Sequence, residues 1–235
     1  VVIWTTTPWT IPGNRAIAFG DSINYCIFKV QESKNNLIKD NKYLVAKSLL
    51  EEVCERCNIN KFELVKEIKG EELGNTICHH PFSKIGFDYD VPLLKAVFVE
   101  DSEGTGLVHI APCYGENDYN LALDNNIVIK DIVKDDGCYR DNTPVFAGIH
   151  VFKAHLNVIE KLKEQNKLLG SREYRHSYPH SWRSKKPIIY RTTPQWFISM
   201  KKNNLKDKAI KGIEDTKWIP KSSKNRIQSM VENRP

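Results

Sequence analysis

The segment Trp4-Thr5-Thr6-Thr7-Pro8-Trp9-Thr10 follows an apolar run and places three consecutive hydroxyl side chains directly before a proline. Threonine favours extended structure, and proline withdraws a backbone donor and holds the preceding residue extended. We therefore expect a strand over Val1–Thr6, whose end presents hydroxyls and free backbone groups to a polar ligand. Such strand ends are more often plain structure, so this segment alone does not establish a site.

A second segment lies about a hundred residues further on and reads Gly104-Thr105-Gly106-Leu107-Val108-His109-Ile110-Ala111-Pro112. Its glycines allow a backbone to approach a ligand closely. A histidine and a rigid Ala-Pro pair follow them. A lone histidine is usually structural, so the two segments indicate a functional site only when they are taken together.

Together, the two segments resemble the editing (connective-peptide) domain of isoleucyl-tRNA synthetases. Asn14-Arg15-Ala16-Ile17-Ala18 follows the first segment as in that family, and Gly115-Glu116-Asn117-Asp118-Tyr119 follows the second. Pro8-Trp9 separates the chain from valyl and leucyl enzymes, which typically carry an arginine at this motif. Three later segments look like those that lead from the editing domain back to the synthetic core: His176–Arg183, Thr193–Phe197 and Glu232–Pro235.

The resemblance implies an α+β fold, namely a β-barrel-like editing domain with peripheral helices, followed by return strands and short helices toward a class I synthetic core. We expect the editing domain over residues 1–171, truncated at its N-terminus, and a basic return segment over 172–235. The chain opens mid-strand without an initiator Met, which favours a fragment of a longer protein.

The apolar pattern predicts the individual elements. Turn signals at Pro12-Gly13-Asn14 and Gly20-Asp21-Ser22 bound the early strands. The expected strands are Val1–Thr6, Ala16–Phe19, Tyr25–Val30, Phe62–Ile68, Leu93–Val99 and Gly106–Ile110, with extended return strands over Pro187–Ser199. The expected helices are Tyr43–Cys57, Asn117–Asn125, Phe152–Leu169, Leu205–Ile213 and Ser223–Glu232.

Hydrolysis of an aminoacyl ester requires a placed water and a selective pocket, because the ester is already activated. The resemblance assigns contacts with the terminal adenosine and the ester to the threonine segment, and pairing with the substrate α-ammonium to Asp118. His109 either excludes the larger isoleucyl side chain or positions water, and both roles stay open. The implied catalytic residues are Thr7, His109 and Asp118. The implied substrate-binding residues are Thr5, Thr6, Trp9, Asn14, Gly104, Thr105 and Gly106.

The implied activity is post-transfer editing, in which the valyl ester of mischarged tRNA(Ile) is hydrolysed. One methylene group in an apolar pocket lets an enzyme discriminate between two substrates by only about 1–3 kcal/mol, and this family is the standard example of how editing compensates for that limit. The alternatives are a non-catalytic tRNA-positioning insertion and a valyl-type domain that acts on threonyl-tRNA. The implied partners are the tRNA(Ile) acceptor end, the valine ester and the remainder of the synthetase in cis.

Synthetic chemistry is not expected in this chain. The His-Ile-Gly-His motif is missing from the sequence, and Lys221–Lys224 only superficially resembles the synthetase lysine loop. ATP and Mg would therefore serve the synthetic core outside the chain, and we expect no cofactor for editing. The sequence also departs from many bacterial relatives at Cys113-Tyr114-Gly115, where they carry Gly-His-Gly, so a second essential histidine is not expected.

Charge is unevenly distributed along the chain, whose net charge is +6. Residues 172–235 hold 16 Lys and Arg against 5 Asp and Glu, whereas the rest holds 19 against 24. This basic stretch also carries Trp182, Trp196 and Trp218, a combination that suits RNA. We expect RNA affinity to reside mainly there, although a general lysine bias is the alternative.

The remaining features predict a cytoplasmic protein without a metal or a membrane segment. No apolar run approaches the roughly 20 residues of a membrane helix. Six scattered cysteines indicate reduced thiols rather than disulfides. Cys54 and Cys57 are expected to be half-buried on a helix, and His79 and His80 to lie on the surface.

Overall fold

The chain forms two compact units. The computed structural model describes residues 1–234 and, within them, every side chain except that of Asn36. Val1–Thr192 form the first unit and Thr193–Pro235 the second. Residues 172–192, which the sequence places with the basic return segment, lie within the first unit. The mixed α+β class is confirmed.

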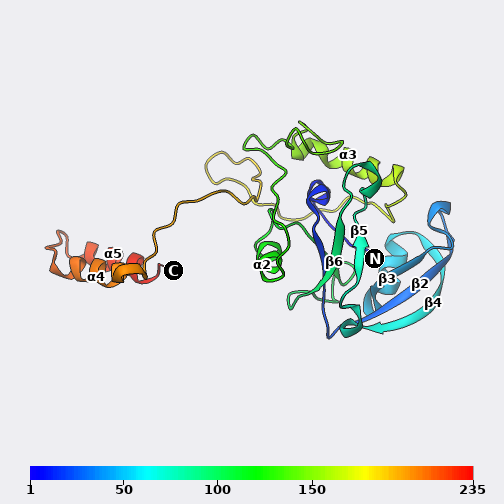
Figure 1. Cartoon of the computed structure of the whole chain (residues 1–235), viewed down its shortest axis with the longest axis horizontal. Helices are drawn as coiled ribbons and strands as arrows, with labels where there is room; N and C mark the ends of the chain where they lie inside the picture. Colours follow the sequence, from blue (N-terminus) through cyan, green and yellow to red (C-terminus); the bar gives the residue numbers. More distant parts are fainter. Residues whose placement is uncertain (235) are drawn as a thin grey trace. The chain divides into compact units, whose positions relative to one another are not determined.

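The strands form two sheets in the first unit, so the expected barrel is not confirmed. One sheet has the order β5-β6-β1-β7, and the other has the order β3-β2-β4. Figure 1 shows β5 and β6 side by side, with the three-stranded sheet beside them. All four residues of β1 are buried, because β1 lies between parallel β6 and antiparallel β7. The strands are β1 (Ala16–Phe19), β2 (Asn24–Ser33), β3 (Lys42–Ala46), β4 (Ile59–Lys69), β5 (Ile77–His79), β6 (Asp90–Lys95) and β7 (Leu107–Ile110).

The helices divide between the two units. In α3 the buried side chains of Val151, Ala154, Val158 and Leu162 lie on one face, and the His150 side chain accepts a hydrogen bond from the Phe152 amide at the start of the helix. No helix among the described residues is long and apolar enough to cross a membrane. The α-helices are α1 (Leu50–Arg56), α2 (Glu116–Asp124), α3 (Val151–Glu164), α4 (Leu205–Asp215) and α5 (Ser222–Glu232). The 3-10 helices are η1 (Pro8–Gly13), η2 (Asn36–Ile38), η3 (Lys47–Leu49), η4 (Gly70–Leu73), η5 (Ser83–Ile85) and η6 (Lys202–Asn204).

The expected strand over Val1–Thr6 is wrong. The segment is irregular, and its backbone bond to a neighbouring strand runs from the Val2 amide to the Leu44 carbonyl at 3.2 Å. β propensity alone does not make a strand, because a strand also needs a partner whose register matches. The threonines therefore approach the site on an irregular segment.

The expected helix over Tyr43–Cys57 is half wrong. Its first part is β3, in which Ala46 lies opposite Tyr25 and Val45 opposite Cys26 of β2. The helix itself begins only at Leu50. Short apolar runs fit a strand and a helix equally well, and pairing with β2 decides here. Cys57 is half-buried at the end of α1, as expected, whereas Cys54 in α1 is fully buried and not half-buried.

The other elements differ mainly at their ends. β1, α2, α4 and α5 are confirmed within a residue or two, and β2 and β4 are longer than expected. The expected strand Leu93–Val99 is displaced to Asp90–Lys95, and the expected helix Phe152–Leu169 ends at Glu164. The expected return strands over Pro187–Ser199 are wrong, because the segment is irregular and its one β-type pairing is an isolated bridge between His180 and Pro187.

A buried tyrosine joins the two sheets. The Tyr25 hydroxyl accepts from the Gly20 amide at 2.9 Å and donates to the Gly106 carbonyl at 2.8 Å. Gly106 has φ +72°, and a Cβ there would lie 2.3 Å from the Ala46 Cβ. Because both the conformation and the contact require glycine, Gly106 fixes how β7 meets β3.

We expect Gly106→Ala to reduce the free energy of unfolding by about 2–5 kcal/mol, because left-handed strain and overpacking add. Gly148→Ala is the matched control, since Gly148 has φ +73° and nothing within 4 Å of its Cβ position. The control should lose only about 1–2 kcal/mol. Chemical denaturation of both variants checks this, and equal losses would contradict the close approach to Ala46.

His80 is buried, so its expected surface position is wrong, whereas His79 is exposed. His80 Nε2 donates to the Ile11 carbonyl at 3.0 Å, and His80 Nδ1 accepts from the Phe82 amide at 3.0 Å. Its ring stacks on Phe87 at 5.0 Å. Burial lowers the pKa of His80 to about 4. The ring therefore stays neutral in the folded protein and holds η1.

Acid should destabilise this fold through its buried histidines. Burial lowers the pKa of His80 to about 4 and that of His109 to about 3, whereas unfolded histidine titrates near 6.5. Between these values the unfolded chain binds more protons. The free energy of unfolding should therefore fall as pH falls below about 6.5, by up to about 1.4 kcal/mol per pH unit for each histidine.

Denaturation between pH 7 and pH 5 measures this slope. His80→Gln should reduce it because one buried titrating ring is removed, and His79→Gln, at the exposed neighbour, is the matched control. A stability independent of pH over this range contradicts the burial of the two neutral rings.

Candidate functional site

The threonine segment leads into η1 through a sharp change of direction. Pro8 occupies the first helical position, where its missing amide and fixed φ are tolerated. The Thr7 carbonyl accepts from both the amide and the hydroxyl of Thr10, at 3.0 and 2.9 Å. The turn therefore buries Thr10 and leaves the preceding threonines nearer the surface.

The three predicted threonines lie together and are half-buried. Thr5 Oγ1 accepts from the Thr7 amide at 3.0 Å, which bends the segment. The Thr6 and Thr7 hydroxyl oxygens are 3.4 Å apart. Hydroxyl groups from adjacent residues thus gather at the entry to η1.

His109 joins η1 to β7 and is 8% exposed. Its Nε2 lies 3.0 Å from Thr10 Oγ1, and its Nδ1 lies 2.6 Å from Asn14 Nδ2. Asn14 Nδ2 also donates to the Ala16 carbonyl at 2.9 Å. The structure therefore brings His109 and Asn14, two predicted site residues, into direct contact.

The partners of His109 determine its tautomer. The Asn14 amide must place its NH2 group toward His109, because that group also donates to the Ala16 carbonyl. His109 Nδ1 is then an acceptor, and Nε2 carries the proton and donates to Thr10, whose own proton is directed to Thr7. Burial lowers the pKa of His109 to about 3, and the neighbouring His80 adds to this. The ring is neutral, and protein groups occupy both of its nitrogens.

Asp118 stands in the first turn of α2 and faces back toward the end of β7. Its Oδ2 accepts from the Ala111 amide at 2.8 Å. Burial raises the pKa of Asp118, and the Ala111 hydrogen bond opposes that rise. The charged form of Asp118 is therefore less stable than it would be in water. A cation beside the carboxylate would restore that stabilisation.

The predicted glycine segment lies at the other end of β7 from His109. The Gly106 carbonyl accepts from Tyr25, and the Thr105 carbonyl accepts from the Ala46 amide at 2.9 Å. The Cβ position of Gly104 lies 3.5 Å from the Trp4 ring. The described contacts of these residues join the sheets, and their role in substrate binding stays a prediction.

Trp9 is 5% exposed and packs in the second hydrophobic cluster. Its ring meets the Tyr114 ring edge-on at 5.1 Å, and its carbonyl accepts from the Tyr139 hydroxyl at 2.5 Å. Tyr114 Cε2 also lies 2.8 Å from where a Gly13 Cβ would be. Tyr114 thus packs on η1 at two points, and Trp9 is placed as support for η1.

Three residues at the site were missed by sequence reasoning. Thr10 belongs to the quoted motif, and its hydroxyl meets His109, but its spacing gave no separate signal. His80 and Tyr114 support η1 from distant parts of the chain, so only tertiary contacts show their roles. The departure at Cys113-Tyr114-Gly115 marked the right place in the sequence, although it did not show why.

The positively charged side chain of Arg15 lies beside the hydrogen bonds of Asn14. The Arg15 guanidinium carbon is 4.0 Å from the centre of the Tyr89 ring, and Arg15 Nε has no hydrogen-bond partner among the described residues. The Tyr89 hydroxyl in turn donates to the Asn14 carbonyl at 3.0 Å. The residue next to the Asn14 hub therefore carries positive charge.

Within residues 1–234, no group of three or more His, Cys, Asp or Glu side chains could hold a metal ion. A depression of ≈ 510 Å³ involves other residues, among them Lys134, Gly137, His150, Lys186 and Arg191. It does not include the predicted site residues. Burial and contacts, not cavity size, mark the candidate site.

The chain is similar to isoleucine–tRNA ligases. It is 49% identical over 235 residues to the isoleucine–tRNA ligase of Pelagibacter ubique (strain HTCC1062), which covers 100% of the chain and 26% of the relative. It is 42% identical over 234 residues to that of Francisella tularensis subsp. tularensis (strain WY96-3418), which covers 100% of the chain and 24% of the relative. The chain thus spans about a quarter of the length of these relatives.

The solved structure described as "The crystal structure of GlLeuRS-CP1" shares the fold, with a TM-score of 0.54 and 15% identity over 72% of this chain and 83% of that one. The family model for "tRNA synthetases class I (I, L, M and V)" matches residues 25–235. The chain therefore belongs to the class I tRNA synthetases of the isoleucine, leucine, methionine and valine group.

Proposed function

We propose that this chain is the editing part of a longer isoleucine–tRNA ligase and hydrolyses the aminoacyl ester of mischarged valyl-tRNA(Ile). The observation that carries the proposal is the contact of His109 with both Thr10 and Asn14. It joins the threonine segment to the histidine segment in one place. The similarity to isoleucine–tRNA ligases supports the choice of the parent enzyme.

In this proposal the half-buried hydroxyls of Thr5, Thr6 and Thr7 bind the terminal adenosine and the ester. Asp118 binds the substrate α-ammonium, because a neighbouring cation stabilises the charged form of its partly buried carboxylate. The positive charge of Arg15 suits a polyanionic substrate. Water attacks the ester carbonyl, and the products are valine and tRNA with a free terminal hydroxyl.

In this proposal His109 limits the size of the substrate pocket and does not act as a general base. Both ring nitrogens have protein partners, and a ring with a pKa of about 3 is a poor proton acceptor at neutral pH. A neutral, fixed imidazole instead defines the space that is left for the substrate side chain. Valine fits that space in this proposal, and isoleucine, with one more methylene, does not.

His109→Ala should enlarge the pocket, so that correctly charged isoleucyl-tRNA is hydrolysed at a rate comparable with valyl-tRNA. Deacylation of both esters by the full-length synthetase measures this, with threonyl ester as the test for a valyl-type domain. Slower valyl hydrolysis with negligible isoleucyl hydrolysis would instead assign His109 to water positioning. No hydrolysis of any ester by the unmodified enzyme would favour the tRNA-positioning alternative.

Asp118→Ala should slow valyl-tRNA deacylation about 10- to 150-fold, because it removes a charge-assisted hydrogen bond worth roughly 1.5–3 kcal/mol. Asp118→Asn should recover little activity, since the amide keeps the shape but not the charge. The free energy of unfolding of Asp118→Asn at pH 7 should not fall, because burial disfavours the native charge. Near-normal deacylation of valyl-tRNA by Asp118→Ala would contradict the proposed role of Asp118 in binding the substrate α-ammonium.

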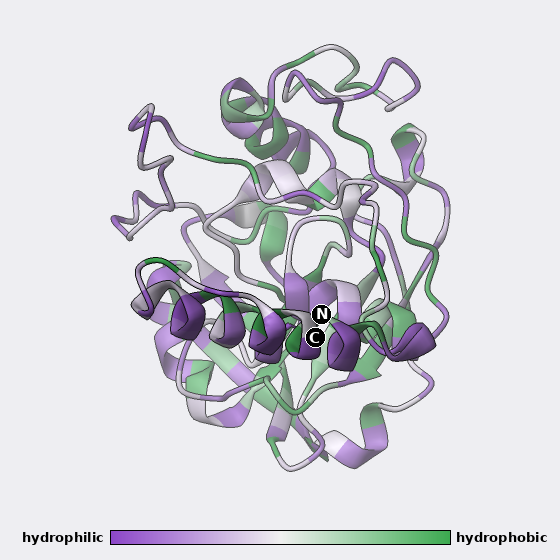
Figure 2. Cartoon of the chain, turned by 90° about the vertical axis from the view of Figure 1, so that its left-hand side faces the viewer, coloured by the Kyte–Doolittle hydropathy of each residue, from purple (hydrophilic) through white to green (hydrophobic). Residues whose placement is uncertain are grey.

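We also propose that the basic C-terminal part binds the RNA backbone. Figure 2 shows that much of the ribbon of α4 and α5 has the colour of hydrophilic residues. Lys208 and Lys211 of α4 are exposed, as is Lys217, which follows that helix. Because each phosphate contact contributes to the salt dependence of binding, these lysines should steepen it.

Lys208→Gln, Lys211→Gln and Lys217→Gln together should weaken tRNA binding and reduce the slope of log K against log salt by about 0.7–0.9 for each lysine that pairs with a phosphate. Filter binding at several salt concentrations measures the slope. The matched control replaces the exposed lysines Lys39, Lys61 and Lys66 of the first unit with Gln. Equal effects of the two triple variants would assign the charge asymmetry to lysine bias.

A further inference from the structure

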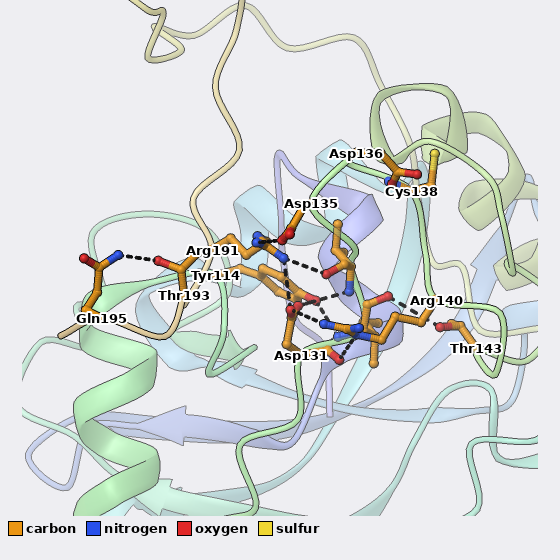
Figure 3. Close-up of polar contacts among 12 residues, drawn as sticks. Tyr114, Asp131, Asp135, Asp136, Cys138, Arg140, Thr143, Arg191, Thr193 and Gln195 are labelled. Carbon is orange, nitrogen blue, oxygen red and sulfur yellow. Dashed lines mark hydrogen bonds and ion pairs between the residues drawn. The ribbon is translucent and has the colours of Figure 1, made fainter.

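Asp131 is the centre of a polar cluster that the sequence did not reveal (Figure 3). Its Oδ2 accepts from Arg140 Nη2 at 3.0 Å and from Arg191 Nη1 at 3.2 Å. Its Oδ1 accepts from the Tyr114 hydroxyl at 3.3 Å and from the Val133 amide at 3.0 Å. Both carboxylate oxygens are therefore fully engaged.

The cluster is sheltered at its centre. The side chains of Asp131 and Arg191 are 19% and 15% exposed, whereas that of Arg140 is 44% exposed. Arg191 also pairs with Asp135 and donates to the Val133 carbonyl at 3.0 Å. Removal of one partner from such a sheltered pair leaves the other charge poorly compensated and is therefore destabilising.

Tyr114 connects this cluster to the candidate site. Its hydroxyl accepts from the Ile132 amide at 3.1 Å while it donates to Asp131. Burial raises the Tyr114 pKa, so the hydroxyl keeps its proton. The same ring packs on Trp9 and Gly13 of η1, and its Cε2 edge lies nearest Gly13. Asp131 thereby fixes the ring against the helix that presents Thr10.

The same cluster holds a later part of the chain against this loop. Arg191 is followed by Thr192, whose amide donates to the Cys113 carbonyl at 2.9 Å. Cys113 directly precedes Tyr114, and the Tyr114 amide donates to the Ala111 carbonyl at 2.9 Å. Ala111 is the residue whose amide bonds Asp118. Arg191 and Thr192 therefore hold the loop that connects β7 to α2.

We propose that Asp131 and Arg191 are positioning residues for ester hydrolysis, which act through Tyr114 on η1 and on the loop before Asp118. The inference rests on the proposed editing function. Neither residue touches the substrate. Their effect is to hold the threonine side of the site at a fixed distance from the Asp118 side. Displacements of about 1 Å between reacting groups cost up to about a hundredfold in rate, so removal of this support should reduce turnover.

The test uses the full-length synthetase and compares Asp131→Asn, Tyr114→Phe and Arg191→Lys with Asp141→Asn. Asp141 is the matched control, because it pairs with Lys134 in the same region but is 88% exposed. Valyl-tRNA deacylation gives kcat and KM separately. Hydrogen exchange of the peptide over residues 8–15 reports on η1 directly. Isoleucine charging of tRNA shows that each variant is folded.

We expect Asp131→Asn to lower kcat about tenfold or more and to change KM less than about twofold, because the change disturbs alignment and not binding. Tyr114→Phe should show the same pattern, and the double variant should be no slower than the slower single variant, since Tyr114 acts on η1 through the hydrogen bond that Asp131 provides. Exchange over residues 8–15 should quicken in both. Arg191→Lys should retain part of the rate, because it keeps the charge but not the forked geometry. Asp141→Asn should match the unmodified enzyme.

Normal kcat and normal exchange over residues 8–15 in both Asp131→Asn and Tyr114→Phe would overturn the proposal. So would a loss of charging that parallels the loss of deacylation, because the cluster would then only stabilise the fold. An unmodified enzyme without deacylation would instead contradict the proposed function. In that case exchange over residues 8–15 still decides whether the cluster holds η1.

Discussion

The hydrogen bond between Asn14 Nδ2 and His109 Nδ1, 2.6 Å long and buried, is the contact on which the site depends. It joins the residue that follows η1 to the middle of β7, although 95 residues separate them in the chain. The same amide group binds the Ala16 carbonyl, so the bond also ties the site to β1, the central strand. Because a buried polar group without a partner is costly, this set is stable only when all its members are in place.

Neutrality of the buried histidines follows from the same constraint. His109 and His80 each use one ring nitrogen as donor and the other as acceptor, and burial lowers the pKa of both. A charged ring would have two donors and would meet the Asn14 NH2 group with a proton. The candidate site therefore contains a neutral His109 ring and a partly buried Asp118 carboxylate, whose pKa is raised by burial.

Local sequence signals predicted the parts of the fold that local signals control. The apolar run Ala16–Phe19 is bounded by turns and is strand β1, and α2, α4 and α5 follow helical periodicity. Leu44 and Val45 suited a helix as well as a strand, and pairing with β2 decided between them. His80 lay beyond such reasoning, because its burial depends on the Ile11 carbonyl 69 residues away. The Asp131 cluster likewise joins residues from 114 to 191, and no local pattern marks it.

The resemblance implies that Asn14, His109 and Asp118 share one site. The structure shows the Asn14–His109 contact and the Asp118–Ala111 hydrogen bond, and the shared site stays a prediction. The most direct measurement of the central claim is a crystal structure of the full-length synthetase with a non-hydrolysable amide analogue of valyl-adenosine. We predict the valyl ammonium within hydrogen-bonding distance of the Asp118 carboxylate and the valyl side chain against the His109 ring. An analogue bound elsewhere in the first unit, such as in the depression beside Lys134 and His150, would contradict this assignment.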